Sequence, residues 1–171
     1  MRYQRGAISL TSGSSPSLVY PRGWEDQIVI NDPEDGAEIA SMAGTDFNPE
    51  VNISICRHKN GKRMGGVIFQ NFTGESIAMH SAGWDDHWIN RDMIFVTFDY
   101  PFNQLGVKRV FGQVPEDNWH AQRFNSKLGF KPVARIEGVY KHNIACIVMC
   151  MGREDCRLLK VKPRYIQSHL S

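Results

Sequence analysis

The sequence has no long apolar run and no excess of charge of either sign. No stretch approaches the roughly 20 apolar residues that a membrane-spanning helix needs, and residues 1–5 lack the apolar core of a secretion signal. The 20 basic and 18 acidic side chains give a formal net charge of +2, too small to predict a nucleic-acid partner. We read Lys160, Lys162 and Arg164 as a solvated tail. We therefore expect a cytoplasmic protein without membrane or nucleic-acid partners.

Cysteines are few and lack the spacing of a disulfide framework or a metal site. Cys56 stands alone, and Cys146, Cys150 and Cys156 form no C-x-x-C pair. We expect these cysteines to be reduced and mainly structural. Residues 80–87 contain two histidines and two aspartates without a recognised ligand pattern, so the sequence predicts no metal site.

The chain does contain enough apolar sequence for one well-packed domain. Of its 171 residues, 42% are hydrophobic and 22% are charged, as in ordinary globular proteins. Residues 1–23 are rich in serine, glycine and proline, and we expect a flexible arm there with one edge strand at 17–20. Residues 24–171 are expected to form a single domain.

Apolar periodicity and turn residues predict an alternation of strands and helices. Residues 32–34 (Asp-Pro-Glu) supply a cap, a first-turn proline and an early acid for a helix. Residues 60–61 (Asn-Gly) predict a tight hairpin, and Pro101 predicts a kink at 98–101. The predicted strands are 28–30, 51–58, 63–72, 76–81, 108–114, 130–140 and 143–151, and the predicted helices are 33–43, 90–105 and 118–128. This order indicates a mixed α/β (α+β) fold.

Residues 118–130 carry the most informative pattern. Asp117 or Asn118 can cap the first turn of a helix, because a short polar side chain there accepts a bond from a free backbone N–H. Three apolar residues recur at spacings of three and four: Ala121, Phe124 and Leu128. Gly129 stands where helices commonly end in a left-handed residue. The segment is therefore expected to be an amphipathic helix followed by a strand.

This arrangement, N-x-x-A-x-x-F-x-x-x-L-G-F, resembles the fourth helix and following strand of the GNAT-type N-acetyltransferases. The resemblance covers residues 28–157. It implies a mixed, mostly antiparallel central sheet with helices on both faces, splayed open between its fourth and fifth strands. Here these strands would be 76–81 and 108–114.

The resemblance also implies acetyl-CoA as cofactor and an N-acyltransferase that moves the acetyl group to a primary amine by direct attack in a ternary complex. Asn118, Ala121 and Phe124 would lie against the pantetheine arm of acetyl-CoA. The strand beside the opening would contribute cofactor contacts and the backbone N–H groups for the thioester oxygen. The cofactor contacts would be His80, Ser81, Ala82 and Gly83, and the N–H groups for the thioester oxygen would come from residues 80–82.

The sequence departs from the family in its phosphate loop. The usual Q/R-x-x-G-x-G/A run is missing, as in a subgroup with many phage and bacterial members, and the region has one glycine, Gly83. Asn90 can instead cap the following helix, whose N-terminus attracts anions, and Arg91 can contact phosphate. The alternative is that Arg91 pairs with Asp85 or Asp86.

A second departure concerns proton transfer. The position of the family's catalytic tyrosine is Asn125, whose amide has no proton to give. His80 is the best candidate for the base that takes the proton of the amine, because imidazole titrates near neutral pH. Glu75 is the second candidate and Asp99 the third. The alternative for His80 is a packed, hydrogen-bonded histidine.

Two questions stay open at this point. A protein of this fold that binds CoA or another protein without catalysis would also explain both departures. The sequence does not identify the amine acceptor, which could be a protein or a small molecule. Residues 23–24, 33–48 and 84–88 are expected to line the acceptor side of the site. A homodimer is common in the family.

Overall fold

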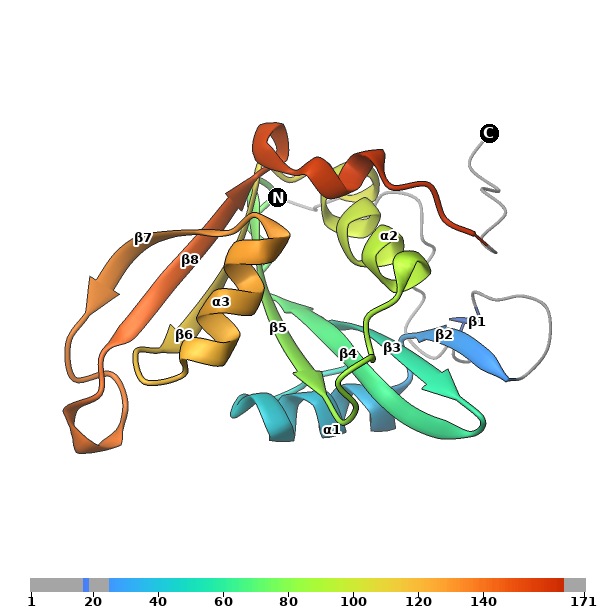
Figure 1. Ribbon diagram of the computed structural model, residues 1–171, viewed down its shortest axis with the longest axis horizontal. Helices are drawn as coiled ribbons and strands as arrows, with labels where there is room; N and C mark the ends of the chain where they lie inside the picture. Colours follow the sequence, from blue (N-terminus) through green and yellow to red (C-terminus); the bar gives the residue numbers. More distant parts are fainter. Residues whose placement is uncertain (1–16, 19–24, 165–171) are drawn as a thin grey trace.

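The computed structural model describes residues 17–18 and 25–164, which form an eight-stranded sheet with helices on both faces (Figure 1). The strands are β1 (Ser17–Leu18), β2 (Asp26–Ile30), β3 (Ile53–Lys59), β4 (Lys62–Gln70), β5 (Ser76–Gly83), β6 (Arg109–Pro115), β7 (Lys131–Ile136) and β8 (Cys146–Gly152). The helices are α1 (Pro33–Ala43), α2 (Arg91–Asp99) and α3 (Trp119–Leu128). The strand order is β1-β2-β3-β4-β5-β6-β8-β7.

The pairing of the strands is antiparallel except between β5 and β6, so the predicted mixed, mostly antiparallel sheet is confirmed. The predicted edge strand at 17–20 is described only at Ser17–Leu18, and the rest of the predicted arm lies outside the described residues. Within the described ranges, no helix is long and apolar enough to cross a membrane.

The helix ends follow the local sequence. The Asp32 carboxylate accepts hydrogen bonds from the backbone N–H groups of Glu34 at 2.9 Å and Asp35 at 3.0 Å, which caps α1. Gly44 ends this helix in the left-handed region, with φ of 72°. Asn60 and Gly61, with φ of 52° and 71°, form the predicted hairpin between β3 and β4.

The helix that contains Pro101 widens instead of breaking. α2 ends at Asp99, and Tyr100–Gln104 continue as a π-helical turn in which Leu105 N–H donates to the Tyr100 carbonyl at 3.0 Å. A kink or break was expected near 98–101; the regular helix ends at Asp99, but the chain continues as this π-helical turn, in which Pro101 has no N–H to donate.

The last two predicted strands were too long. β7 ends at Ile136 and β8 starts at Cys146, because Gly138 with φ of 64° begins a loop that includes a 3-10 turn at Lys141–Asn143. The pair is antiparallel, as predicted.

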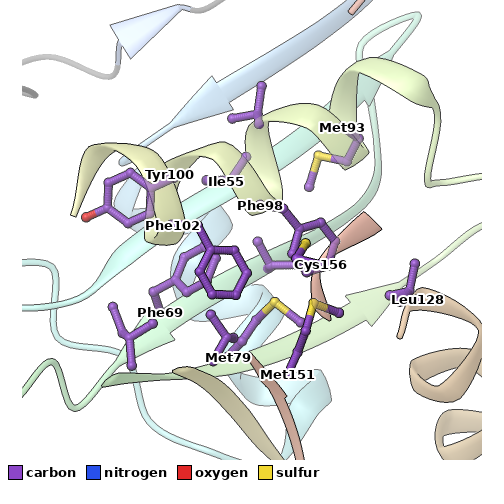
Figure 2. Close-up of a cluster of buried hydrophobic side chains, with 14 of the residues drawn as sticks. Ile55, Phe69, Met79, Met93, Phe98, Tyr100, Phe102, Leu128, Met151 and Cys156 are labelled. Carbon is purple, nitrogen blue, oxygen red and sulfur yellow. The ribbon is translucent and has the colours of Figure 1, made fainter. Parts of the chain in front are cut away.

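The two faces of the sheet hold separate cores. Successive side chains on β4 and β5 point to opposite faces, so Val67 and Phe69 enter one core and Ile68 the other. The larger core lies under α2 and α3, and Figure 2 shows its aromatic and sulfur side chains, among them Phe69, Met79, Phe98, Phe102 and Met151. The smaller core lies under α1 and consists of Ile39, Ala40, Cys56, Ile68 and Ala82, with Phe47 packed against it.

A buried carboxylate also holds α1 to the sheet. Asp35 is 2% exposed, and its two oxygens lie 2.7 Å from His58 Nε2 on β3 and 2.7 Å from Arg63 Nε on β4. Burial raises the pKa of the Asp35 carboxyl, but the hydrogen bonds and charges of His58 and Arg63 outweigh burial and hold this pKa below its ordinary value. The ionised carboxylate therefore bridges three elements.

Replacing Arg63→Met would leave this buried carboxylate with His58 as its remaining ion-pair partner. We expect the free energy of unfolding at pH 7 to fall by about 3 to 5 kcal/mol, the cost of breaking a buried ion pair from one side. The measurement is urea unfolding followed by circular dichroism. Lys62→Met, at the exposed neighbouring position, is the matched control and should change stability little; an equal loss in both variants would contradict the role of Asp35.

Candidate functional site

The sheet opens between β5 and β6. These parallel strands share only three residue pairs, from Ser76 opposite Arg109 to Ala78 opposite Phe111, although β5 continues to Gly83. Beyond Ala78 the strands diverge, as Figure 1 shows at the centre of the molecule. The predicted splay between strands 76–81 and 108–114 is therefore confirmed.

Each strand diverges because it stays paired with its other neighbour. β5 follows β4 as far as the pair Gly83 and Gly65, and β6 follows β8 as far as the pair Pro115 and Cys146. At the fork the chains are close, since a Cβ at Gly112 would lie 3.1 Å from the Met79 carbonyl oxygen. The opening thus starts from a tight junction and leaves one edge of each strand without a strand partner among the described residues.

His80 lies at this opening on the α1 face of the sheet. Strand alternation gives it the same face as Ala78 and Ala82, opposite to Met79 in the larger core. Burial lowers the pKa of the His80 imidazole below its ordinary value. No hydrogen bond joins this ring to any other described residue, which disfavours the alternative of a hydrogen-bonded structural histidine.

A pocket of about 140 Å³ opens beside this histidine, and we call it the His80 pocket. Its lining residues are Thr45, Gln70, Asn71, Ala78, His80, Phe111, Gly112 and Gln113. Of the segments expected to line the acceptor side, 33–48 contributes Thr45. The 84–88 segment does not line the pocket, and residues 23–24 lie outside the described part of the chain.

On the opposite face, α3 flanks the opening. Asn118 caps this helix, since its Oδ1 accepts the backbone N–H of Ala121 at 3.1 Å. Ala121 and Phe124 pack against the larger core as predicted, and the Phe124 ring lies 6.1 Å from the ring of Trp88. Asn125 carries no side-chain hydrogen bond within the described ranges, and its carbonyl accepts the N–H of Phe130 at the helix end.

The position of the Trp88 side chain requires two glycines in neighbouring strands. A Cβ at Gly65 or Gly83 would lie 2.6 or 2.3 Å from atoms of this indole ring. The absence of a side chain at both glycines therefore lets the Trp88 indole pack closely against β4 and β5. Gly65, Gly83 and Trp88 are all visible in the sequence, but the sequence did not indicate that Trp88 would pack on these two glycines.

The segment after β5 crosses back over the sheet and away from β6. Arg57 on β3 donates from Nη1 to the carbonyls of His87 at 2.8 Å and Trp88 at 3.1 Å. Asp26 accepts two further bonds from the same guanidinium. Since Arg57 stands two strands from Gly83 in register, the residues that follow this crossing, including Arg91, start α2 away from His80.

The start of α2 is covered by the C-terminal segment (Figure 1). Asn90 caps the helix through a bond from Met93 N–H at 2.8 Å, as predicted. Arg91 Nε donates to the Lys162 carbonyl at 2.6 Å, and Arg164 N–H donates to Asp92 Oδ1 at 2.6 Å. The basic residues read as a solvated tail are exposed, but their backbone is held against α2.

Arg91 pairs with no carboxylate among the residues that the structure describes. Asp85, offered as a partner in the alternative interpretation, instead accepts the backbone N–H of His87 at 2.7 Å. The exposed Arg91 guanidinium therefore keeps its charge available.

The two other candidate bases lie elsewhere. Glu75 precedes the paired end of β5 and forms an exposed ion pair with Lys108 at 2.6 Å, so it lies at the closed end of the fork. Asp99 is buried, and its carboxylate accepts bonds from the side chains of Asn103 at 2.7 Å and Gln104 at 2.9 Å. His80 is thus the one candidate base that the structure brings to the opening.

No protein-family model and no curated protein matches this sequence. Solved structures match the fold. A probable acetyltransferase is 12% identical with a TM-score of 0.58, and the match covers 77% of this chain and 95% of that chain. The spermidine N-acetyltransferase from Vibrio cholerae, in complex with CoA and spermine, is 16% identical with a TM-score of 0.53, over 61% of this chain and 68% of that chain. At these identities the likeness is one of fold alone, and this chain has the fold of the GNAT-type N-acetyltransferases.

Proposed function

We propose that this protein is an acetyl-CoA-dependent N-acyltransferase that transfers an acetyl group to a primary amine. The observation that carries the proposal is the fork between β5 and β6, with the pocket of His80 on one face and α3 on the other. The Vibrio cholerae enzyme of the same fold, whose structure contains CoA and spermine, supports this choice of cofactor and reaction.

The open strand edge fits the pantetheine arm of acetyl-CoA. Beyond Ala78, the edge of β5 that faces β6 has no strand partner, and an extended chain with amide groups can pair with such an edge. Residues 80–83 would supply these backbone contacts. Asn118 would donate from Nδ2, which has no partner within the described ranges, while Ala121 and Phe124 provide the apolar side.

The phosphates require another source of positive charge, because the glycine loop is missing. Asn90 orders the first turn of α2, and the exposed Arg91 guanidinium forms no ion pair with the described carboxylates. Charge-assisted bonds from a guanidinium to phosphate are among the strong hydrogen bonds of proteins. We assign Arg91 this role on the phosphate side of the cofactor.

His80 is the proposed base. Its lowered pKa keeps the imidazole neutral near pH 7, so it can accept the proton of an amine in its pocket. The amine nitrogen then bonds to the acetyl carbon, and the carbon–sulfur bond breaks. Backbone N–H groups of residues 80–82 would stabilise the charge on the carbonyl oxygen. The thiolate takes its proton from water, since Asn125 has none to give.

The second candidate function is non-catalytic: a protein of this fold that binds CoA or another protein. Asn125, at the place of the family's tyrosine, is the observation that favours it. The two functions differ in turnover: a binding module gains thermal stability from acetyl-CoA but releases no CoA with any amine.

The cofactor contacts can be separated by two substitutions. Asn118→Ser keeps a capping oxygen but removes the Nδ2 donor, so acetyl-CoA should bind about 2- to 10-fold more weakly. Arg91→Ala should weaken binding about 10- to 100-fold, with a smaller dependence on salt. Calorimetric titration is the measurement, and Lys127→Ala, at the other end of α3, is the control. Unchanged affinity in both test variants would refute this cofactor placement.

Removal of the imidazole tests the chemical step. His80→Gln should lower kcat about 10²- to 10⁴-fold, as expected for loss of a general base, and leave acetyl-CoA affinity unchanged. His142→Asn, at an exposed loop position, should keep full activity.

The pH profile tests the same residue independently. Because the pKa of His80 is lowered, the proton that inactivates the base binds only below the ordinary histidine pKa of about 6.5. The acid limb of kcat/KM should therefore lie below pH 6.5 in the wild type and disappear in His80→Gln. An acid limb at or above pH 6.5, or one that survives the substitution, would argue against His80 as the base.

A further inference from the structure

The His80 pocket has a chemical character that restricts the acceptor. Among the described residues that line it, none is acidic or basic apart from the histidine, which burial keeps neutral near pH 7. A polyamine brings additional ammonium groups, and a charge taken out of water without an opposite charge is costly. The described lining therefore offers no opposite charge to the additional ammonium groups of a polyamine.

The polar groups of the pocket are amides and a hydroxyl. Gln70 is fixed at both ends: its Nε2 donates to the Asp46 carbonyl, and its Oε1 accepts from the Thr45 hydroxyl at 3.4 Å. The Gln113 amide on β6 is exposed and has no partner in the described part of the chain. Amides both donate and accept hydrogen bonds, and so match hydroxyl groups, which do the same.

One wall of the pocket is aromatic. Phe111 lies half-buried at the last pair of the fork, on the same face of the sheet as Gln113. Its ring offers a flat apolar surface between polar groups, which can pack on the C–H face of a saturated ring. A cavity of about 150 Å³ holds benzene, so the open pocket of about 140 Å³ can receive one side of a substituted six-membered ring while the other substituents stay in solvent.

We propose that the acceptor is an amino sugar: one pyranose ring with a primary amine and free hydroxyl groups. Phe111 packs on its apolar face, Gln113 and Asn71 bind its hydroxyls, and the amine reaches His80. This inference rests on the proposed acyl transfer. In that step the amine nitrogen loses a proton to His80 and gains the acetyl carbon, while the thiolate leaves and is protonated by water.

The test compares acceptors at saturating acetyl-CoA by the release of free thiol. Glucosamine and galactosamine should be acetylated with kcat/KM at least about 10-fold above spermidine and a lysine-containing peptide. Faster turnover of spermidine or the peptide than of both amino sugars would overturn the proposal. Acetyl-CoA binding without acetylation of either sugar would also overturn it, whereas failure to bind acetyl-CoA would remove the proposed function itself.

Two variants locate the recognition in this pocket. Gln113→Ala should raise the KM for the better amino sugar about 2- to 10-fold, and Phe111→Leu should raise it similarly, with acetyl-CoA affinity unchanged. Gln27→Ala on β2 is the matched control and should behave as the wild type. Because Gln113 is exposed, its variant should fold normally, and an unchanged KM there would contradict the assignment.

Discussion

The structure depends on a parallel pairing that stops after three residue pairs. On its outer side β5 pairs with β4 from Ala78 to Gly83, and β6 pairs with β8 along its whole length, so the sheet stays intact while its centre opens. Backbone N–H and C=O groups that lack a strand partner tend to recruit another chain or ligand. The fork therefore creates a binding edge without any specialised loop, which matters here because the glycine-rich phosphate loop is missing.

The two cores hold different helices in place around this fork. The larger core fixes α2 and α3 on one face, with Trp88 lying on the bare surfaces of Gly65 and Gly83. The buried Asp35 ties α1 to β3 and β4 on the other face, and the loop after α1 then brings Thr45 to the pocket of His80. In the proposed function, the cofactor side and the acceptor side would thus lie on opposite faces of one sheet.

Local sequence predicted the elements whose ends are set by nearby residues. The Asp32 cap, the Asn60 hairpin and the Gly129 helix end all appear as expected, and the opening of the sheet was expected from the resemblance to the GNAT-type family. Sequence did not predict the crossing held by Arg57, the contact of residues 162–164 with α2, or the presence of Thr45 and Gln113 in one pocket. These contacts join segments far apart in the chain, and no periodicity encodes them.

The central claim is that the unpaired edge of β5 receives the acyl donor. Amide hydrogen exchange with and without acetyl-CoA tests this most directly, because strand-edge N–H groups that gain a partner exchange more slowly. The account predicts new protection at residues 79–83 and at the start of α3, with little change in β2 and β3. Protection confined to other segments, or none at 79–83 under saturating acetyl-CoA, would contradict it.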